Sequence, residues 1–154
     1  MAHENIKEKI KDLIIKLGFK DEEVEVSHND DSIWFSIESP SARHLLNRDA
    51  EALIALNHLA IKMAEQMSRE EEKYPRVIID ANGFEKKKIE NLKTVAHMMA
   101  ERARYFKSSI DVEPMSAHDR RIIHEHLSTF SDIKTESEGM GSGRHIVIKY
   151  IGGI

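Results

Sequence analysis

The chain of 154 residues contains no cysteine, only three prolines and only 6% aromatic residues. Without cysteine it can form no disulfide, no thiolate nucleophile and no thiolate-bound zinc or iron–sulfur site. It has no run of about 18 apolar residues, so we expect no membrane insertion. The N-terminal stretch is charged and lacks the apolar segment of a secretory signal, which predicts a cytoplasmic protein.

Motifs of common enzymes and metal sites are also missing. The chain has no GxSxG nucleophile elbow, no P-loop and no Rossmann glycine pattern. Nine histidines are present, but no HExxH or comparable ligand spacing appears. His124 and His126 lie about 200° apart around a helix, so they cannot share a metal there. We therefore expect no catalysis, no metal and no other cofactor.

Charge is divided unevenly along the chain, although the net charge is −4. Residues 1–75 hold 10 lysines and arginines against 16 acidic residues, whereas residues 76–154 hold 13 against 11. Phosphate contacts are the main source of affinity for nucleic acids. A polyanion should therefore prefer the second half.

The first half alternates between helical and extended patterns. Apolar residues at helical spacing predict a helix over 4–17, and Gly18 follows as a stop signal. Alternating segments at 24–28 and 32–39 predict a hairpin with its turn at 29–31. Two helices are expected between Pro40 and Met67, with a bend in "LNRDAEA", then a loop at 68–75, a buried strand at 76–80 and a turn at 81–83. The predicted order over residues 1–82 is α-β-β-α-α-β.

The second half, residues 83–154, predicts the order α-β-α-β-β. A long helix begins at Phe84, with apolar residues on one face and lysines and arginines on the other. A short strand at 109–113 and a helix at 116–130 follow. Strands at 133–137 and 144–151 are joined by the glycine-rich "EGMGSG". The whole chain is thus predicted to be an α+β protein of two domains.

The helix at 116–130 carries the most informative pattern. Ser116 followed by Asp119 is typical of a helix start. At about 100° per residue, Arg120 and His124 should be neighbours at the border of an apolar side formed by Ile122, Ile123, Leu127 and Phe130. A guanidinium can pair with a phosphate or lie flat on a base, and an imidazole can stack or donate a hydrogen bond. Both would suit a single-stranded nucleic acid.

A purely structural interpretation stays open at this point, because an Arg-x-x-x-His spacing arises often by chance. Arg120 could pair with Asp119 or Glu125 on the surface, and His124 could fill the edge of the core. Resemblance to a known family weighs against this interpretation. The stretch "PMSAHDRRIIHEHLSTFSDIKTESEGMGSGRHIVIKY" resembles the R-three-H domain of the bacterial Jag family (SpoIIIJ-associated, KhpB or EloR proteins).

The resemblance rests on "EPM", "DRRIIH", "TESEG" and "RHIVIKY" in that order. The preceding "RVIIDANGFEKKKIENLKTVAHMMAERAR" resembles the link between domains in this family, and the order of elements over residues 1–82 resembles its type II KH domain. It implies binding of single-stranded RNA or DNA, with Arg120 and His124 at the positions of the arginine and histidine. Nearby motif positions are taken by Arg121, Lys134, Thr135, Ser137 and Arg144.

The KH-like half departs from the family at its Gly-x-x-Gly loop, because Asn47, Arg48, Asp49 and Ala50 stand there. Side chains at these positions would crowd a phosphate, and Asp49 would repel it. We expect this half to have lost most or all nucleic-acid binding. The N-terminal Jag domain common in the family has no counterpart in this sequence, so functions of that module are not implied.

Two hypotheses follow. In the first, the chain is a cytoplasmic single-stranded RNA- or DNA-binding protein that acts through residues 83–154, as a post-transcriptional regulator. In the second, it is an interaction or dimerisation module whose KH-like half docks a partner. The resemblance implies self-association or pairing with another KH protein, and an acidic surface would suit a basic partner.

Overall fold

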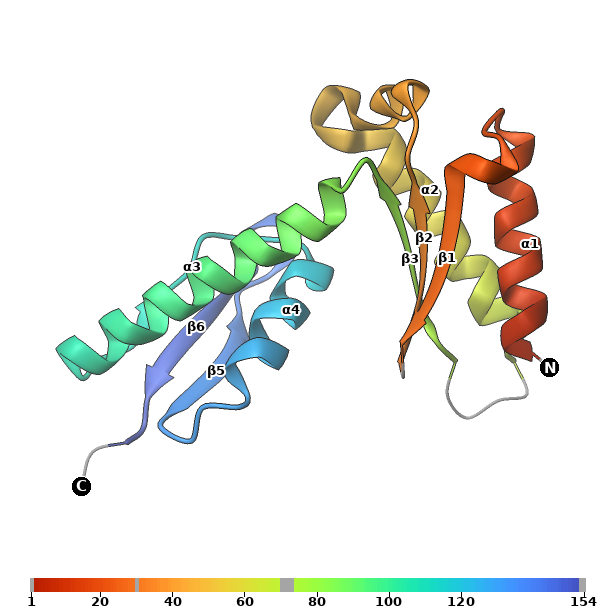
Figure 1. Ribbon diagram of the computed structural model, residues 1–154. Coiled ribbons are helices and arrows are strands. Elements are labelled where there is room, and N and C mark those ends of the chain that lie inside the picture. The colour runs from red at the N-terminus through yellow and green to blue at the C-terminus, as the bar shows by residue number, and fades with distance from the viewer. Residues whose placement is uncertain (1, 30, 70–73, 153–154) are drawn as a thin grey trace. The chain divides into compact units, whose positions relative to one another are not determined.

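The computed structural model describes residues 2–29, 31–69 and 74–152, and the chain divides into two compact units, Met1–Lys86 and Lys87–Ile154 (Figure 1). Asp30 of the predicted turn and residues 70–73 of the predicted loop lie outside the described residues. Across these three ranges, none of the helices has both the length and the apolar character needed to span a membrane.

Unit 1 contains two helices and a three-stranded sheet. Its main elements are α1 (Ala2–Lys16), β1 (Val24–Asn29), β2 (Ser32–Ile37), α2 (Asn47–Met67) and β3 (Arg76–Ala81). The strand order is β1-β2-β3, with β1 antiparallel and β3 parallel to β2. The predicted hairpin is therefore present, and of the two helices predicted between Pro40 and Met67 the second is α2 and the first is a 3-10 helix, Pro40–Leu46.

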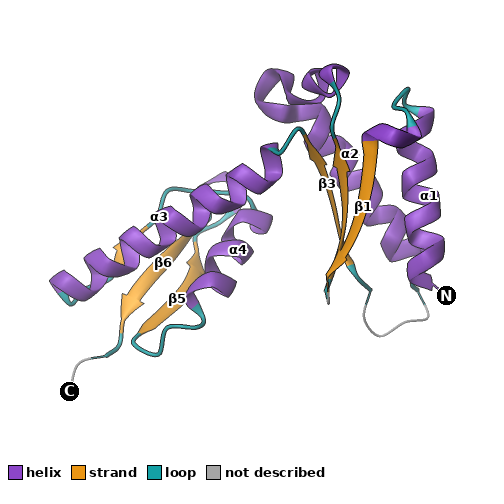
Figure 2. Cartoon of the chain, viewed as in Figure 1, coloured by secondary structure: helices purple, strands orange, loops and turns teal. Residues whose placement is uncertain are grey.

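The core of unit 1 lies between the helices and one face of this sheet (Figure 2). Alternate residues of β2 point to opposite faces, so Ile33, Phe35 and Ile37 are fully buried while Trp34 and Ser36 lie on the other face and are half-buried. Ile6, Ile10 and Ile14 supply the buried side of α1. Burying each such side chain stabilises the fold by about 1.5–3 kcal/mol.

The bend predicted in "LNRDAEA" is confirmed, and it consists of a left-handed turn. A 3-10 helix over Pro40–Leu46 precedes it, and α2 continues to Met67. At the start of α2, Arg48, Asp49 and Ala50 depart from helical backbone, with φ values of 51°, 57° and 61°. A left-handed residue other than glycine costs roughly 1–2 kcal/mol. This break in the helical path therefore carries a conformational cost.

Unit 2 contains the rest of α3 (Phe84–Phe106), followed by β4 (Ile110–Asp111), α4 (Ala117–Leu127), β5 (Ile133–Glu138) and β6 (His145–Tyr150). The strand order is β4-β6-β5, and both pairings are antiparallel. The predicted α+β class and the order α-β-α-β-β are confirmed. The predicted helix at 116–130 ends earlier than expected, at Leu127. Ser128 N–H still donates to His124 C=O in the α-helical pattern, but Phe130 N–H donates to Leu127 C=O, three residues back, which tightens the chain beyond the helix end.

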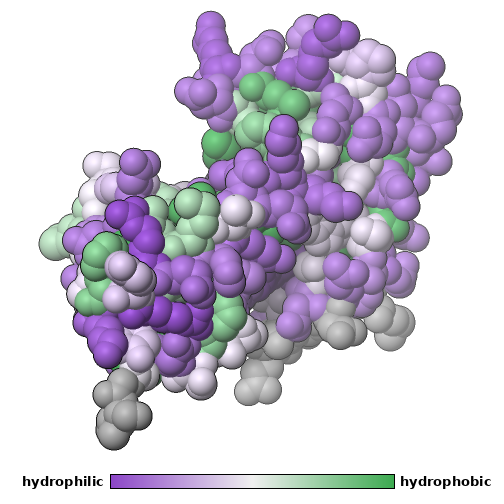
Figure 3. All heavy atoms as spheres, turned by 60° about the vertical axis from the view of Figure 1, so that its left-hand side comes forward, coloured by the Kyte–Doolittle hydropathy of each residue, from purple (hydrophilic) through white to green (hydrophobic). Residues whose placement is uncertain are grey.

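The core of unit 2 lies on one face of its sheet, under α3 and α4. Ala96, Ala100 and Ala103 of α3 are fully buried in this core. The apolar side predicted for the second helix is confirmed, since Ile122, Ile123 and Leu127 are buried and Phe130 packs against the core beyond the helix end. The opposite face of the sheet has a different, charged character. The surface drawn in Figure 3 is mainly hydrophilic, with hydrophobic side chains in small patches.

Candidate nucleic-acid interface

The start of α4 is fixed by its own sequence. Ser116 is the N-cap, and its side chain accepts a hydrogen bond from Asp119 N–H at 3.2 Å. Asp119 itself is buried, and its carboxylate lies 3.3 Å from Lys88 Nζ of α3. The carboxylate is also favourable near the positive end of the helix dipole. These contacts set the rotation of α4 and hence the direction of its border residues.

Arg120 lies in the first turn of α4 and is half-buried. Its Nη1 donates to the Met115 carbonyl at 2.7 Å. The carboxylates that could have neutralised it are engaged elsewhere, since Asp119 pairs with Lys88 and Glu125 pairs with Arg121. A guanidinium has five N–H donors, so Arg120 keeps donors for an external anion.

His124 lies one turn further along α4 and is exposed. Its Nδ1 is hydrogen-bonded to Thr135 Oγ1 of β5 at 2.5 Å. This contact holds the ring at the seam between the helix and the edge strand, and Nε2 has no partner among the described residues. His124 is therefore oriented by the protein and open to a ligand, rather than filling the core.

Arg144 joins the same surface from the start of β6. Its Nε donates to Ser137 Oγ at 2.9 Å, and its backbone carbonyl accepts from Met115 N–H at 3.2 Å. Because Met115 also accepts from Arg120, the two arginines are linked through one residue. Thr135 and Ser137 are two residues apart on β5 and face the same side, about 6.8 Å apart. Five predicted residues thus form one continuous surface, the α4–β5 surface: Arg120, His124, Thr135, Ser137 and Arg144.

Lys134 is not part of the α4–β5 surface. Side chains alternate along β5, so Lys134 points to the opposite face of the sheet from Thr135. There it pairs with Glu136 at 3.2 Å, and Glu136 also accepts from Lys149 at 2.5 Å. The hydrogen bonds from Lys149 and then Lys134 lower the pKa of Glu136. On this face the lysines are paired with carboxylates, so it should attract a polyanion only weakly.

Arg121 is exposed on α4 but is held by an ion pair within the helix. Its Nε lies 3.0 Å from Glu125 Oε1, one turn away. Such exposed pairs contribute only about 0.3–0.5 kcal/mol. Arg121 is therefore close to the α4–β5 surface in sequence while its charge is compensated.

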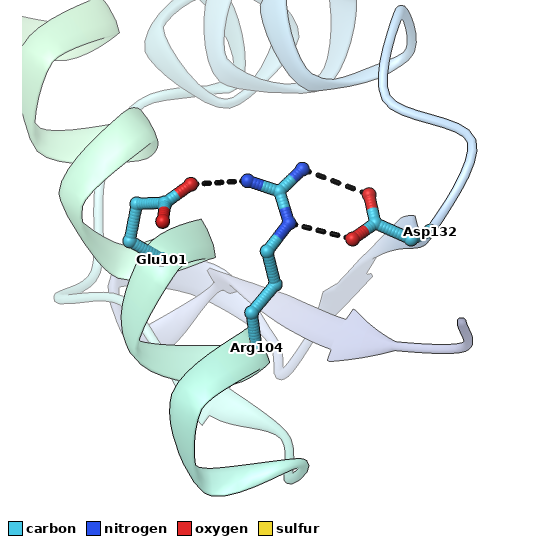
Figure 4. Close-up of polar contacts among 3 residues, drawn as sticks. All are labelled: Glu101, Arg104 and Asp132. Carbon is cyan, nitrogen blue, oxygen red and sulfur yellow. Dashed lines mark hydrogen bonds and ion pairs between the residues drawn. The ribbon is translucent and has the colours of Figure 1, made fainter. Parts of the chain in front are cut away.

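An ion pair between distant segments positions the start of β5. Figure 4 shows the Arg104 guanidinium of α3 between Glu101 and Asp132. Arg104 donates to Asp132 through Nε at 2.6 Å and Nη2 at 2.8 Å, and it also bonds Glu101. The hydrogen bonds from Arg104 lower the pKa of Asp132. In turn, the hydrogen bond to Asp132 is the main cause that raises the pKa of Arg104. Asp132 immediately precedes β5, so this pair supports the strand that carries Thr135 and Ser137.

Three contributors to the surface were not predicted from the sequence. Met115 acts through its backbone, which no side-chain pattern reveals. Arg104 and Asp132 are 28 residues apart, so local spacing gave no signal. Lys134 is the opposite case, because it was predicted to lie near the site. The alternation of side chains along a strand already places it on the opposite face from Thr135.

Comparison with known proteins identifies the second half of the chain. Residues 90–150 match the R3H domain family. The chain is 32% identical to the RNA-binding protein KhpB of Bacillus subtilis (strain 168) over 130 residues, which cover 83% of this chain and 61% of that protein. It is 30% identical to the RNA-binding protein KhpB of Clostridium symbiosum over 104 residues, covering 68% of this chain and 46% of that protein. The chain thus spans between about half and three fifths of these relatives' lengths.

Proposed function

Because residues 90–150 match the R3H domain family and the chain is similar to the RNA-binding protein KhpB, we propose that it binds single-stranded RNA through the α4–β5 surface. The observation that carries the proposal is the arrangement of Arg120, His124 and Arg144 around Met115 and β5. Neither arginine is in an ion pair with a described carboxylate, whereas Arg121 and Lys134 are paired. An anion would therefore gain most from the α4–β5 surface.

Each member of the surface has a distinct part in this proposal. Arg120 and Arg144 neutralise phosphates, since a guanidinium matches phosphate oxygens bidentately. His124 stacks on a base or donates a hydrogen bond, and the hydroxyls of Thr135 and Ser137 reach phosphate oxygens. None of these groups reads one base specifically in a fixed pairing. We infer weak sequence preference, binding of single-stranded DNA as well, and a cytoplasmic role in post-transcriptional regulation.

Fluorescence anisotropy with labelled single-stranded RNA tests the proposal. We expect Arg120→Ala/His124→Ala to weaken binding at least 10-fold. The matched control is Arg121→Ala/Lys134→Ala, which removes two positive charges from residues whose charges are compensated. The control should bind within about threefold of the wild type, because partial neutralisation is already present in the free protein.

The control separates a specific surface from general electrostatics. If affinity follows formal charge, the control loses more affinity than the test variant, because the control removes two formal positive charges and the test variant removes one. That order would contradict the α4–β5 surface. A folded wild type that binds no RNA at low salt would contradict the proposed function itself.

We further propose that unit 1 is a degenerate type II KH domain that docks a partner instead of RNA. Support comes from its order of elements and its mixed sheet β1-β2-β3. In this proposal the turn at Asn47–Ala50 takes the place of the Gly-x-x-Gly loop. Arg48, Asp49 and Ala50 adopt left-handed backbone there, although none is a glycine. The partner would be a second copy or another KH protein. Arg48→Ala should leave RNA affinity unchanged. A marked loss of affinity would mean that unit 1 takes part in RNA binding.

A further inference from the structure

The loop between β5 and β6 presents an apolar side chain four residues before Arg144. The strand ladder ends at the pair Glu138 and His145, and Met140 in the intervening loop is 89% exposed. This is the most exposed of the large hydrophobic residues that the structure describes. A methionine left in water at this position gains nothing from burial. A single exposed apolar side chain is ordinary on a protein surface, and this one is open to contact by a ligand.

The loop is ordered by its own hydrogen bonds. Gly143 N–H donates to Met140 C=O at 3.2 Å, and Arg144 N–H donates to Gly141 C=O at 3.2 Å. The His145 ring Nδ1 lies 3.0 Å from the Gly143 carbonyl, to which it donates. The loop is therefore held in one conformation before any ligand arrives, which lowers the entropic cost of binding.

Glycine is required to build this loop. Gly139 has a φ of 88°, and a Cβ on it would lie 2.9 Å from the Gly143 carbonyl oxygen. Gly141 also has a left-handed φ, 58°. The two glycines flank Met140, so the residue on each side of the exposed side chain has the left-handed backbone of the turn. The low-complexity "EGMGSG" thus specifies a defined shape rather than a flexible linker.

The loop is continuous with the α4–β5 surface. Arg144 closes the loop, and its guanidinium is oriented by Ser137. The nearest acidic residue in the sequence, Glu138, directs its carboxylate to Lys149 at 3.5 Å. An exposed apolar side chain in the loop and an uncompensated guanidinium at the end of the same loop match one ligand in particular, a nucleotide, which joins a flat unsaturated ring to a phosphate.

We propose that the Gly139–Gly143 loop is a preformed base-contacting element, in which Met140 packs on a nucleobase while Arg144 binds an adjacent phosphate. The proposal rests on the proposed binding of single-stranded RNA and adds a contact that neither the R-three-H spacing nor the hydrogen-bond network contains. A thioether is polarizable and its chain has three rotatable bonds, so it adapts to any base. The contact therefore adds affinity with little sequence preference.

Oxidation footprinting tests this contact directly. The wild-type protein is treated briefly with hydrogen peroxide, with and without a saturating single-stranded RNA, and sulfoxide formation at each methionine is measured by mass spectrometry. Met98 of α3, which is 55% exposed, is the internal control. We expect RNA to slow oxidation of Met140 severalfold and to leave the rate at Met98 unchanged.

Matched variants test the contribution to affinity. Met140→Ala should weaken RNA binding by about 2- to 10-fold, the range expected for a sulfur–aromatic contact, and Met98→Ala should not. If the wild type binds RNA but Met140 is unprotected and Met140→Ala binds equally well, the loop proposal fails while the proposed function stands. If the wild type binds no RNA, both fail.

Discussion

The most unusual residues are those in the left-handed turn of unit 1. Arg48, Asp49 and Ala50 follow one another with positive φ, although none is a glycine. The sequence predicted that the helical pattern breaks here, because "LNRDAEA" interrupts the apolar spacing. The handedness could not be predicted, since all three residue types favour right-handed backbone. Tertiary packing, including complete burial of the Ala50 side chain, imposes it.

Replacing Arg48 by glycine should therefore stabilise the protein. Glycine relieves a left-handed penalty of about 1–2 kcal/mol and adds about 0.5–1 kcal/mol of entropy to the unfolded chain, which leaves a net gain of about 0.5–1 kcal/mol. Urea denaturation measures the change. The control His58→Gly, at an exposed right-handed position of α2, should destabilise by about 1 kcal/mol. Equal loss in both variants would contradict the left-handed assignment.

The α4–β5 surface shows what residue patterns can and cannot predict. Helical spacing correctly made Arg120 and His124 neighbours, because that relation is local. Their partners could not be predicted, since Thr135 and Met115 reach them through the fold. Grouping Lys134 with Thr135 overlooked a local rule, because neighbours on a strand point to opposite faces.

At the level of elements, each unit is tied together by a few polar contacts between helices and strands. In unit 1, Asn57 of α2 donates from Nδ2 to Ile79 C=O at 2.8 Å, and its Oδ1 accepts from Ile79 N–H at 2.7 Å. The side chain therefore pairs with the free edge of β3 as another strand would. The periodic patterns that predicted α2 and β3 hold no information about this contact, because it joins residues 22 positions apart.

Asn57→Leu should lower the free energy of unfolding by about 1–3 kcal/mol, because it leaves two backbone groups of Ile79 without a partner. Asn57→Asp keeps one acceptor but loses the donor, so its effect should be intermediate at neutral pH. Thermal or urea unfolding measures both variants. A stability of Asn57→Leu equal to that of the wild type would show that the pairing is replaced by water at no cost.

In unit 2, the pair of Arg104 and Asp132 should make stability depend on acid. The pKa of Asp132 is lowered in the fold, so the unfolded chain binds its proton more readily. The stability that the pair contributes is therefore fully present above the ordinary aspartate pKa of about 3.9. It is lost as pH falls through the lower pKa of Asp132 in the folded state. Asp132→Asn should lower the melting temperature at pH 7, and its difference from the wild type should shrink below pH 4. A constant difference would contradict the ion pair.

Across the whole molecule, charge is divided unevenly between the two halves of the chain. The acidic excess in residues 1–75 and the basic excess in residues 76–154 were evident from the sequence. The order of elements was predictable as well, because helix and strand periods are local. The sequence could not show which cations are compensated. Most basic side chains near β5 pair with carboxylates, and two arginines of the α4–β5 surface do not.

Two unpaired arginines on the α4–β5 surface predict a modest salt dependence for RNA binding. Two phosphates neutralised by Arg120 and Arg144 give a slope of about −1.4 for log affinity against log salt, so affinity should fall about 7-fold from 50 to 200 mM salt. Anisotropy titrations over this range measure the slope. Arg144→Ala should reduce its magnitude by about 0.7, whereas Lys134→Ala should leave it nearly unchanged. A slope steeper than about −3 would require cations outside the α4–β5 surface.

The most direct test of the central claim is an NMR titration of the isotope-labelled chain with single-stranded RNA. The account predicts amide shift changes at residues 115–124, 135–137 and 139–144, with little change at Lys149 or in unit 1. Changes confined to the charged sheet face around Glu136 and Lys149, or to the turn at Asn47–Ala50, would contradict the α4–β5 surface as the RNA site.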